Sequence, residues 1–120
     1  MGRIAGWLLM AIGVTHILFV VWVGRGPLLA VVQDRFFRAL FPHHDRLEIF
    51  WSLCFGVMAF FLGQLISRSE ARGVRTPAVL GWELLALGLV GAVLMPVSGW
   101  WLVTLIGALI LVGARRTRPA

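Results

Sequence analysis

The chain has few charged residues, no lysine and a single cysteine. Only 13% of its 120 residues are charged and 60% are hydrophobic, and the mean hydropathy is +0.93. Soluble domains are about 25% charged and about 45–50% apolar. This composition excludes an ordinary soluble domain, because too little polar surface remains to cover a globule in water. We therefore expect the chain to use lipid as its solvent.

The chain also lacks the motifs of most catalytic, metal and cofactor sites. Cys54 lies alone in an apolar run, which excludes a disulfide framework and a CxxC pair. His43, His44 and Asp45 have metal-binding side chains, but adjacent residues seldom chelate one ion well. The sequence has no glycine-rich phosphate loop, no Ser-His-Asp set and no spaced pair of carboxylates. We expect no metal and no cofactor, and whether the protein is an enzyme stays open.

Four apolar segments come close to the length of a helix that crosses a bilayer, about 20 residues. They are predicted at residues 4–23, 47–66, 77–95 and 99–114. Thr76 and Pro77 resemble an N-cap and a proline at the first helical position of the third segment. The first segment is longer than a typical signal core and no A-x-A site follows it, which favours a spanning helix. These patterns predict an all-α membrane protein, a compact four-helix bundle formed by residues 1–120 as one domain.

The arginines predict the orientation of these helices. With the N-terminus inside, the cytoplasmic side carries seven arginines: Arg3, Arg68, Arg72, Arg75, Arg115, Arg116 and Arg118. The outer side carries four: Arg25, Arg35, Arg38 and Arg46. This bias predicts a multi-pass protein of the cell (inner or plasma) membrane with both termini in the cytoplasm. Because the arginines lie between apolar runs, the net charge of +6 does not indicate a nucleic-acid partner.

The long first loop is predicted to contain an amphipathic helix at about residues 28–41. Apolar residues recur there at helical spacing, at Leu29, Val32, Phe36 and Leu40. Pro42 ends the pattern. We expect this helix to lie in the outer membrane interface, either as a lipid-facing spacer or as a lid over a cavity among the helices.

Self-comparison indicates an internal repeat. Residues 6–13 and 81–88 are identical at five of eight positions, at an offset of 75 residues. A true repeat predicts a parallel 2+2 arrangement, with two helix pairs related by an axis along the membrane normal; chance similarity between apolar helices is the alternative. Glycines also recur seven apart at residues 6 and 13, 56 and 63, and 81 and 88. This spacing predicts close helix packing, because small residues let backbones approach in lipid.

The candidate site is centred on His16, since an ionisable residue inside a membrane needs a partner or water. Thr15 is its neighbour, and Ser52 and Glu48 of the second segment lie at a similar depth. We expect His16 to hydrogen-bond Ser52 or Glu48. The histidine either ties two helices together or orients a ligand or carries a proton.

Glu83 and Gln64 form a second candidate pair near the inner membrane face. Glu83 lies about 9 Å from the inner end of its segment, and Gln64 approaches the same level. Glu83 either pairs with an arginine at the interface or is a buried carboxyl that titrates.

Three sequence features resemble a known family. They are the Gly-x-x-His from Gly13 to His16, the aromatic Phe50-Trp51 near the start of the second segment, and Gly81-Trp82 in the third. With the long outer loop, they resemble a bacterial family of small four-helix membrane proteins of unknown function that is distantly similar to DoxX-like proteins. The resemblance implies the architecture, and some DoxX-like relatives are associated with quinone-linked redox chemistry.

The leading hypothesis is a small integral membrane protein that binds an apolar small molecule, a lipid or a partner membrane protein in an outer-leaflet cavity near His16. One alternative is a quinone-linked redox protein in which His16 orients the quinone. Another is a small proton-coupled transporter that uses Glu83 and His16. Small multidrug-resistance transporters differ from this chain, because they carry an acidic residue where it has His16. The expected surroundings are the lipid bilayer, and assembly as a homo-oligomer stays open.

Overall fold

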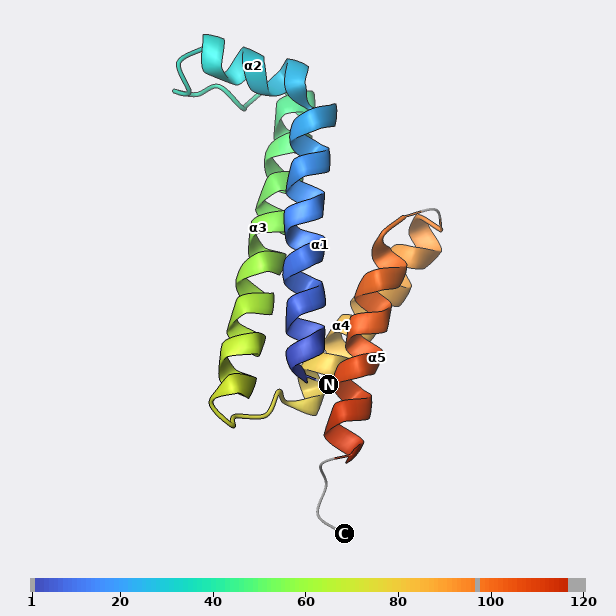
Figure 1. Cartoon of the computed structure of the whole chain (residues 1–120). Helices are drawn as coiled ribbons and strands as arrows, with labels where there is room; N and C mark the ends of the chain where they lie inside the picture. The colour runs from blue at the N-terminus through green and yellow to red at the C-terminus, as the bar shows by residue number, and fades with distance from the viewer. Residues whose placement is uncertain (1, 97, 117–120) are drawn as a thin grey trace. The chain divides into compact units, whose positions relative to one another are not determined.

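The computed structural model describes residues 2–96 and 98–116, and its regular structure there is entirely helical. The helices, in chain order, are α1 (Gly2–Val23), α2 (Arg25–Gln33), α3 (His44–Ala71), α4 (Ala78–Leu94) and α5 (Trp100–Arg116) (Figure 1). The chain divides into two compact units. The α2 unit is residues 11–61, and the α4–α5 unit is residues 1–10 with 62–120.

By length and composition, two helices suit a membrane span. The 22 residues of α1 and the 28 residues of α3 correspond to about 33 and 42 Å of helix, against about 30 Å of bilayer hydrocarbon. The other long helices, α4 and α5, are apolar but have 17 residues each.

The helix ends differ from the predicted ones where polar groups decide them. Helix α3, predicted as the segment 47–66, starts three residues earlier and ends five residues later. Asp45 in its first turn and Arg68 in its last turn have the charges that the helix dipole favours. The other three long helices agree with the predicted segments within two residues. Thr76 is not the N-cap of α4: Pro77 takes that position, and the Thr76 hydroxyl donates a hydrogen bond to Glu70 instead.

The predicted amphipathic helix at residues 28–41 is corrected to α2, which ends at Gln33. The N–H groups of Phe36 and Arg35 donate to the carbonyls of Val31 and Val32, which is the hydrogen-bond pattern of a Schellman C-cap. Arg35 then has a φ of 59°, in the left-handed region that glycine usually occupies in this motif. The apolar spacing continues past Gln33, but this cap turns the backbone out of the helix.

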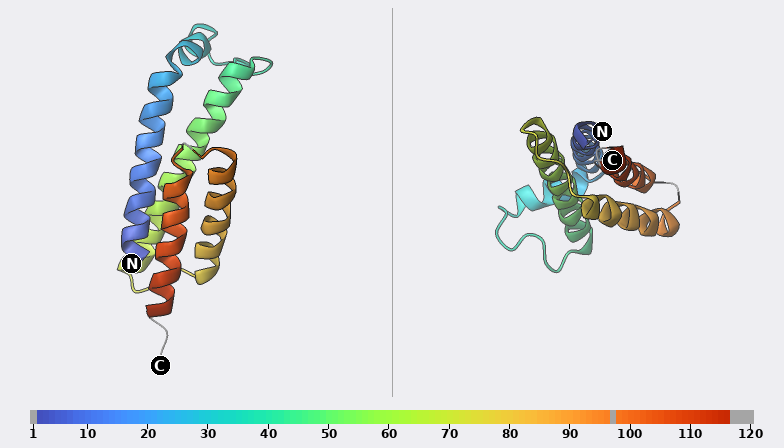
Figure 2. Two further views of the ribbon diagram at one scale, coloured as in Figure 1. Left: turned by 90° about the vertical axis from the view of Figure 1, so that its right-hand side faces the viewer. Right: turned by 90° about the horizontal axis from the view of Figure 1, so that it is seen from below.

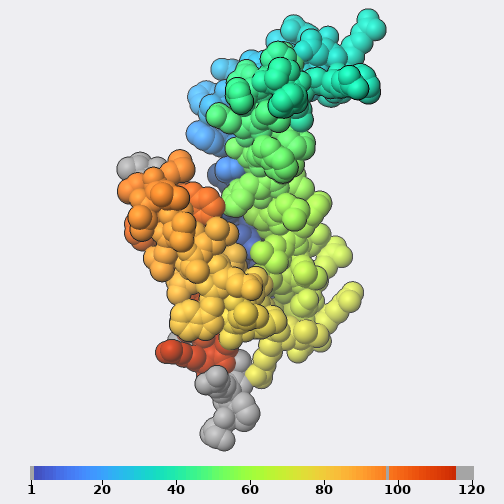
Figure 3. Space-filling model, turned by 180° about the vertical axis from the view of Figure 1, so that it is seen from behind, coloured from blue at the N-terminus to red at the C-terminus, as the bar shows by residue number. Residues whose placement is uncertain are grey.

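In the α2 unit, two glycines bring α1 and α3 into backbone contact. A Cβ added at Gly13 would lie 2.7 Å from the Gly56 carbonyl oxygen and 2.8 Å from the Phe60 nitrogen. The short helix α2 runs across the ends of these two segments (Figures 1 and 3). Gly24 lies at this turn, where an added Cβ would lie 2.6 Å from Ile49 Cδ1.

In the α4–α5 unit, α4 and α5 form an antiparallel hairpin (Figure 2). A Cβ at Gly107 would lie 2.8 Å from the Gly81 carbonyl oxygen, and one at Gly88 would lie 2.5 Å from the Thr104 nitrogen. The start of α1 meets the end of α3 in the same way, because a Cβ at Gly63 would lie 2.6 Å from the Gly6 carbonyl oxygen. The close packing predicted from the glycine spacing is therefore confirmed within each unit.

Candidate functional site: an apolar cavity beneath α2

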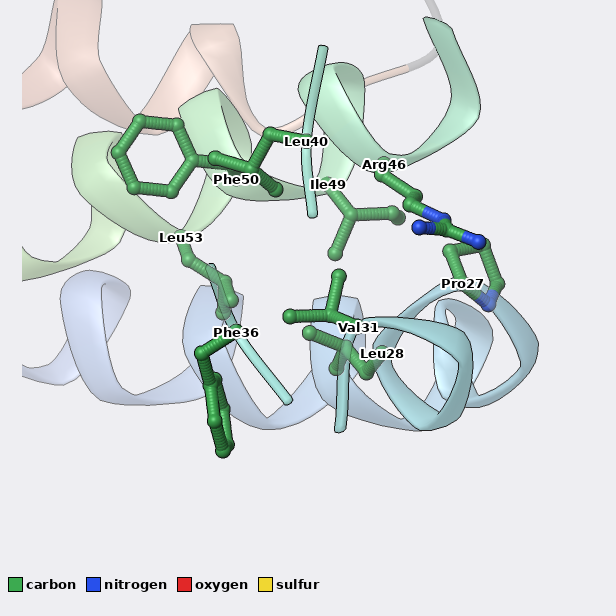
Figure 4. A pocket seen from close by; sticks show the side chains of 9 residues that line it. All are labelled: Pro27, Leu28, Val31, Phe36, Leu40, Arg46, Ile49, Phe50 and Leu53. Carbon is green, nitrogen blue, oxygen red and sulfur yellow. The ribbon is translucent and has the colours of Figure 1, made fainter. Parts of the chain in front are cut away.

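A cavity of about 230 Å³ lies between α2, the loop that follows it, and the beginning of α3. On α3, its lining residues recur at the spacing i, i+3, i+4 and i+7, which places them on one helix face. The lining residues are Pro27, Leu28, Val31, Phe36, Leu40, Arg46, Ile49, Phe50 and Leu53 (Figure 4). Eight of these nine side chains are apolar. The cavity therefore suits an apolar ligand.

The loop after α2 contributes Phe36 and Leu40 to one wall of the cavity and has an unusual backbone conformation. Phe36, which lines the cavity, has a φ of 68°, and Arg38 has a φ of 51°. Non-glycine residues seldom adopt positive φ, and such conformations cluster at functional sites. Ala39 is 3% exposed and anchors the loop from inside.

Arg46 is the one polar residue among those that line the cavity. Its Nη1 donates to Asp34 Oδ2 over 2.6 Å and to the Ala39 carbonyl over 2.7 Å. The Arg46 side chain is 12% exposed, whereas that of Asp34 is 51% exposed. This pair ties the loop after α2 to α3, and the guanidinium lies beside Pro27 at one end of the cavity (Figure 4).

His16 lies outside the lining of this cavity and links α1 to α3. Its Nε2 is 3.1 Å from the main-chain carbonyl oxygen of Ser52, and its ring meets Phe55 edge-on at 5.2 Å. A carbonyl only accepts, so Nε2 carries the proton. The predicted pairing of His16 with Ser52 is thus realised through the serine backbone rather than its hydroxyl.

Gly56 explains why the carbonyl is the partner. In a helix, the side chain of residue i+4 lies beside the carbonyl of residue i, and at this place α3 has glycine. A Cβ at Gly56 would lie 3.2 Å from His16 Cδ2. Without that Cβ, the imidazole reaches the free lone pair of the Ser52 carbonyl.

The other predicted site residues neither line the cavity nor contact His16 through a hydrogen bond. Thr15 and Glu48 are exposed, and His16 takes neither as a hydrogen-bond partner. Glu83 is exposed on α4 and Gln64 is half-buried on α3, and neither has a recorded hydrogen bond or ion pair to a described residue. Within residues 2–96 and 98–116, no three His, Cys, Asp or Glu side chains are grouped to hold a metal ion, and His43 and His44 are exposed.

A smaller polar pocket of about 70 Å³ lies in the α4–α5 unit. Glu70 Oε1 accepts hydrogen bonds there from the Thr76 nitrogen over 2.9 Å and the Thr76 hydroxyl over 2.7 Å. Glu70 follows the predicted apolar span 47–66 and lies outside it. Burial raises the pKa of Glu70, but the Thr76 hydrogen bonds and the charge of Arg75 outweigh burial and hold it below its usual value. The arrangement closes the turn between α3 and α4.

Sequence reasoning missed Arg46 and Glu70 as structural centres. From the sequence, Arg46 is assigned only as one of the outer arginines that predict the orientation, and Glu70 is assigned no role. Arg46 is, however, an arginine at the start of an apolar segment with Asp34 twelve residues before it. The spacing of Asp34 and Arg46 indicates an ion pair only once it is known that the chain folds back after α2 and brings Asp34 beside α3.

The comparisons with known proteins supply a family and no activity. No curated protein and no solved structure matches the chain. One family model, described as a family of unknown function (DUF6463), matches residues 1–117, nearly the whole chain. The chain belongs to this family of unknown function, DUF6463.

Proposed function

We propose that this protein is a small integral membrane protein that binds an apolar small molecule or a lipid acyl chain in the cavity beneath α2. The observation that carries the proposal is the cavity itself, whose lining is apolar except for Arg46. An apolar cavity of about 150 Å³ already holds benzene, and drug-sized sites begin at about 300 Å³. At about 230 Å³, this cavity suits a single ring or part of one acyl chain.

The proposal includes four spanning helices, both termini in the cytoplasm, and α2 with its loop as a lid at the outer interface. The apolar exterior of α1 supports it: Leu18, Phe19 and Trp22 are 66%, 61% and 63% exposed. The Arg25 guanidinium lies 5.4 Å from the Trp22 ring centre, a pairing suited to the membrane interface. The 17-residue helices α4 and α5 span by standing nearly upright or in thinned bilayer.

The close contacts of Gly6 and Gly81, which stand at matching positions of residues 6–13 and 81–88, support the internal repeat. Gly6 meets Gly63 of its antiparallel partner helix, and Gly81, at the repeat position of Gly6, meets Gly107. The likeness to DoxX-like proteins agrees with this layout and adds no chemistry to it.

Neighbouring leucines of α2 give a matched test of binding. Leu28 lines the cavity, whereas Leu29 is 57% exposed. We expect decanol to raise the melting temperature of the purified full chain in nonionic detergent, and L28W to abolish that rise by filling the cavity. L29W adds the same side chain outside the cavity and retains the response. Equal responses of the two variants, or no stabilisation of the parent protein, would refute the proposal.

Cysteine labelling in intact cells tests the orientation. In a Cys54→Ala background, we expect an impermeant maleimide to label F37C from outside, and R72C only after the cells are opened. The reverse pattern would contradict the proposed topology.

A further inference from the structure

We infer that the ligand of this cavity is an anionic single-chain amphiphile, whose carboxylate or phosphate is bound by Arg46. This inference rests on the proposed function and specifies its ligand class. Arg46 is the one charged residue among the nine that line the cavity, so it is the residue that would bind a charged headgroup.

The first argument is the count of guanidinium donors. Arginine has five N–H donors. Both Nη1 hydrogens are used, by Asp34 and by the Ala39 carbonyl. Nε and Nη2 have no hydrogen-bond partner among the described residues, and they keep contact with solvent although the side chain as a whole is 12% exposed. Three donors of a partly buried cation are thus open to a ligand.

The second argument is the shape of this free edge. Nε and Nη2 of one guanidinium point the same way and match the two oxygens of a carboxylate or phosphate. Asp34 bonds Nη1 alone and is 51% exposed, so its compensation of the Arg46 charge is partly screened by solvent. An oxyanion on the free edge would complete the hydrogen bonds of the cation without displacing Asp34.

The third argument is the direction of the cavity from Arg46. The lining residues of α3 run from Arg46 through Ile49 and Phe50 to Leu53, about 10 Å along the helix axis. The polar end is therefore at Arg46 and the apolar end at Leu53. A headgroup at Arg46 places a chain along Ile49 and Leu53, and the volume of about 230 Å³ favours one chain over two.

The test compares ligands that share a tail and differ in the headgroup. Isothermal titration of the purified full chain in nonionic detergent would use decanoate, decyl phosphate, decanol and decyltrimethylammonium, with acetate and inorganic phosphate as tail-free anions. We expect decanoate and decyl phosphate to bind at least about tenfold more tightly than decanol, as a charge-assisted hydrogen-bond pair would give. The tail-free anions should not bind detectably, which distinguishes an amphiphile from a free anion.

Two variants separate headgroup recognition from a loss of folding. R46Q should abolish the preference for decanoate over decanol. Because Arg46 also ties the loop to α3, a general loosening of the cavity would lower the affinity for both ligands equally, so the ratio of the two affinities is the readout. D34N should raise the ratio of decanoate affinity to decanol affinity, because it removes a negative charge that competes with the ligand for Arg46. Equal affinity of the parent protein for decanoate and decanol would overturn the inference while the proposed function stands. An R46Q variant that loses affinity for both ligands alike would also overturn it, and a parent protein that binds none of the decyl ligands would refute the proposed function as well.

Discussion

Replacing Gly13 with alanine tests the backbone contact between α1 and α3 in the α2 unit. The new Cβ would lie 2.7 Å from the Gly56 carbonyl oxygen and 2.8 Å from the Phe60 nitrogen. Both are main-chain atoms of a helix, so relief requires the helices to move apart rather than a side chain to rotate. Overpacking of this kind costs about 1–3 kcal/mol. Alanine gains about 1 kcal/mol in helix propensity, so we expect a net loss of up to about 2 kcal/mol.

Gly26 provides the matched control. It lies in α2, and a Cβ added there meets nothing within 4 Å. We expect G26A to be neutral or up to about 1 kcal/mol more stable. Thermal unfolding in nonionic detergent measures both variants, and each kcal/mol corresponds to about 4 °C in a chain of this size. A G13A protein as stable as G26A would refute the reasoning that the helices are held at backbone contact.

Three further changes test other contacts. Ser67 is 8% exposed and its hydroxyl has no hydrogen-bond partner among the described residues, so S67A should raise stability by about 1 kcal/mol in the same melting assay; a loss would contradict this. The lowered pKa of Glu70 means that its ionised form stabilises the fold above its unfolded pKa, and that this stability is lost as the pH falls through the folded pKa. T76V removes one donor to Glu70, so it should lower the melting temperature at neutral pH and flatten its acid dependence, and an unchanged pH profile would contradict the assignment. R35G should stabilise the chain by up to about 1 kcal/mol, because Arg35 has positive φ, and a destabilised R35G would show that its side chain makes an offsetting contact.

Much of the helical framework was predictable because hydropathy and glycine spacing are local properties. Apolar runs predicted the long helices, and glycines seven apart predicted close helix packing. Which glycines meet, Gly13 with Gly56 and Gly6 with Gly63, is known only from the structure. Gly107, which meets Gly81, was missed, because no second glycine follows it at that spacing. The end of α2 was also missed, since Arg35 holds a backbone conformation for which glycine is the usual signal.

The candidate site was predictable only in part. Depth along two helices narrowed the partner of His16 to Ser52 or Glu48, and the structure selects the Ser52 carbonyl. That choice depends on the missing side chain of Gly56 on the same helix as Ser52. Arg46 was unpredictable as a site residue, because its surroundings come from Asp34 and Ala39 once the loop has folded back.

The sequence by itself determined that the chain is helical and strongly apolar, since both properties are sums over local residues. Only the tertiary structure decided where a cavity lies and which cation faces it. A cavity forms where side chains from α2, the loop and α3 do not fill the space between them. Whether they fill it depends on the angles between these elements, which no local sequence pattern contains. For the same reason, the candidate site is at Arg46 beneath α2, while His16 joins two helices.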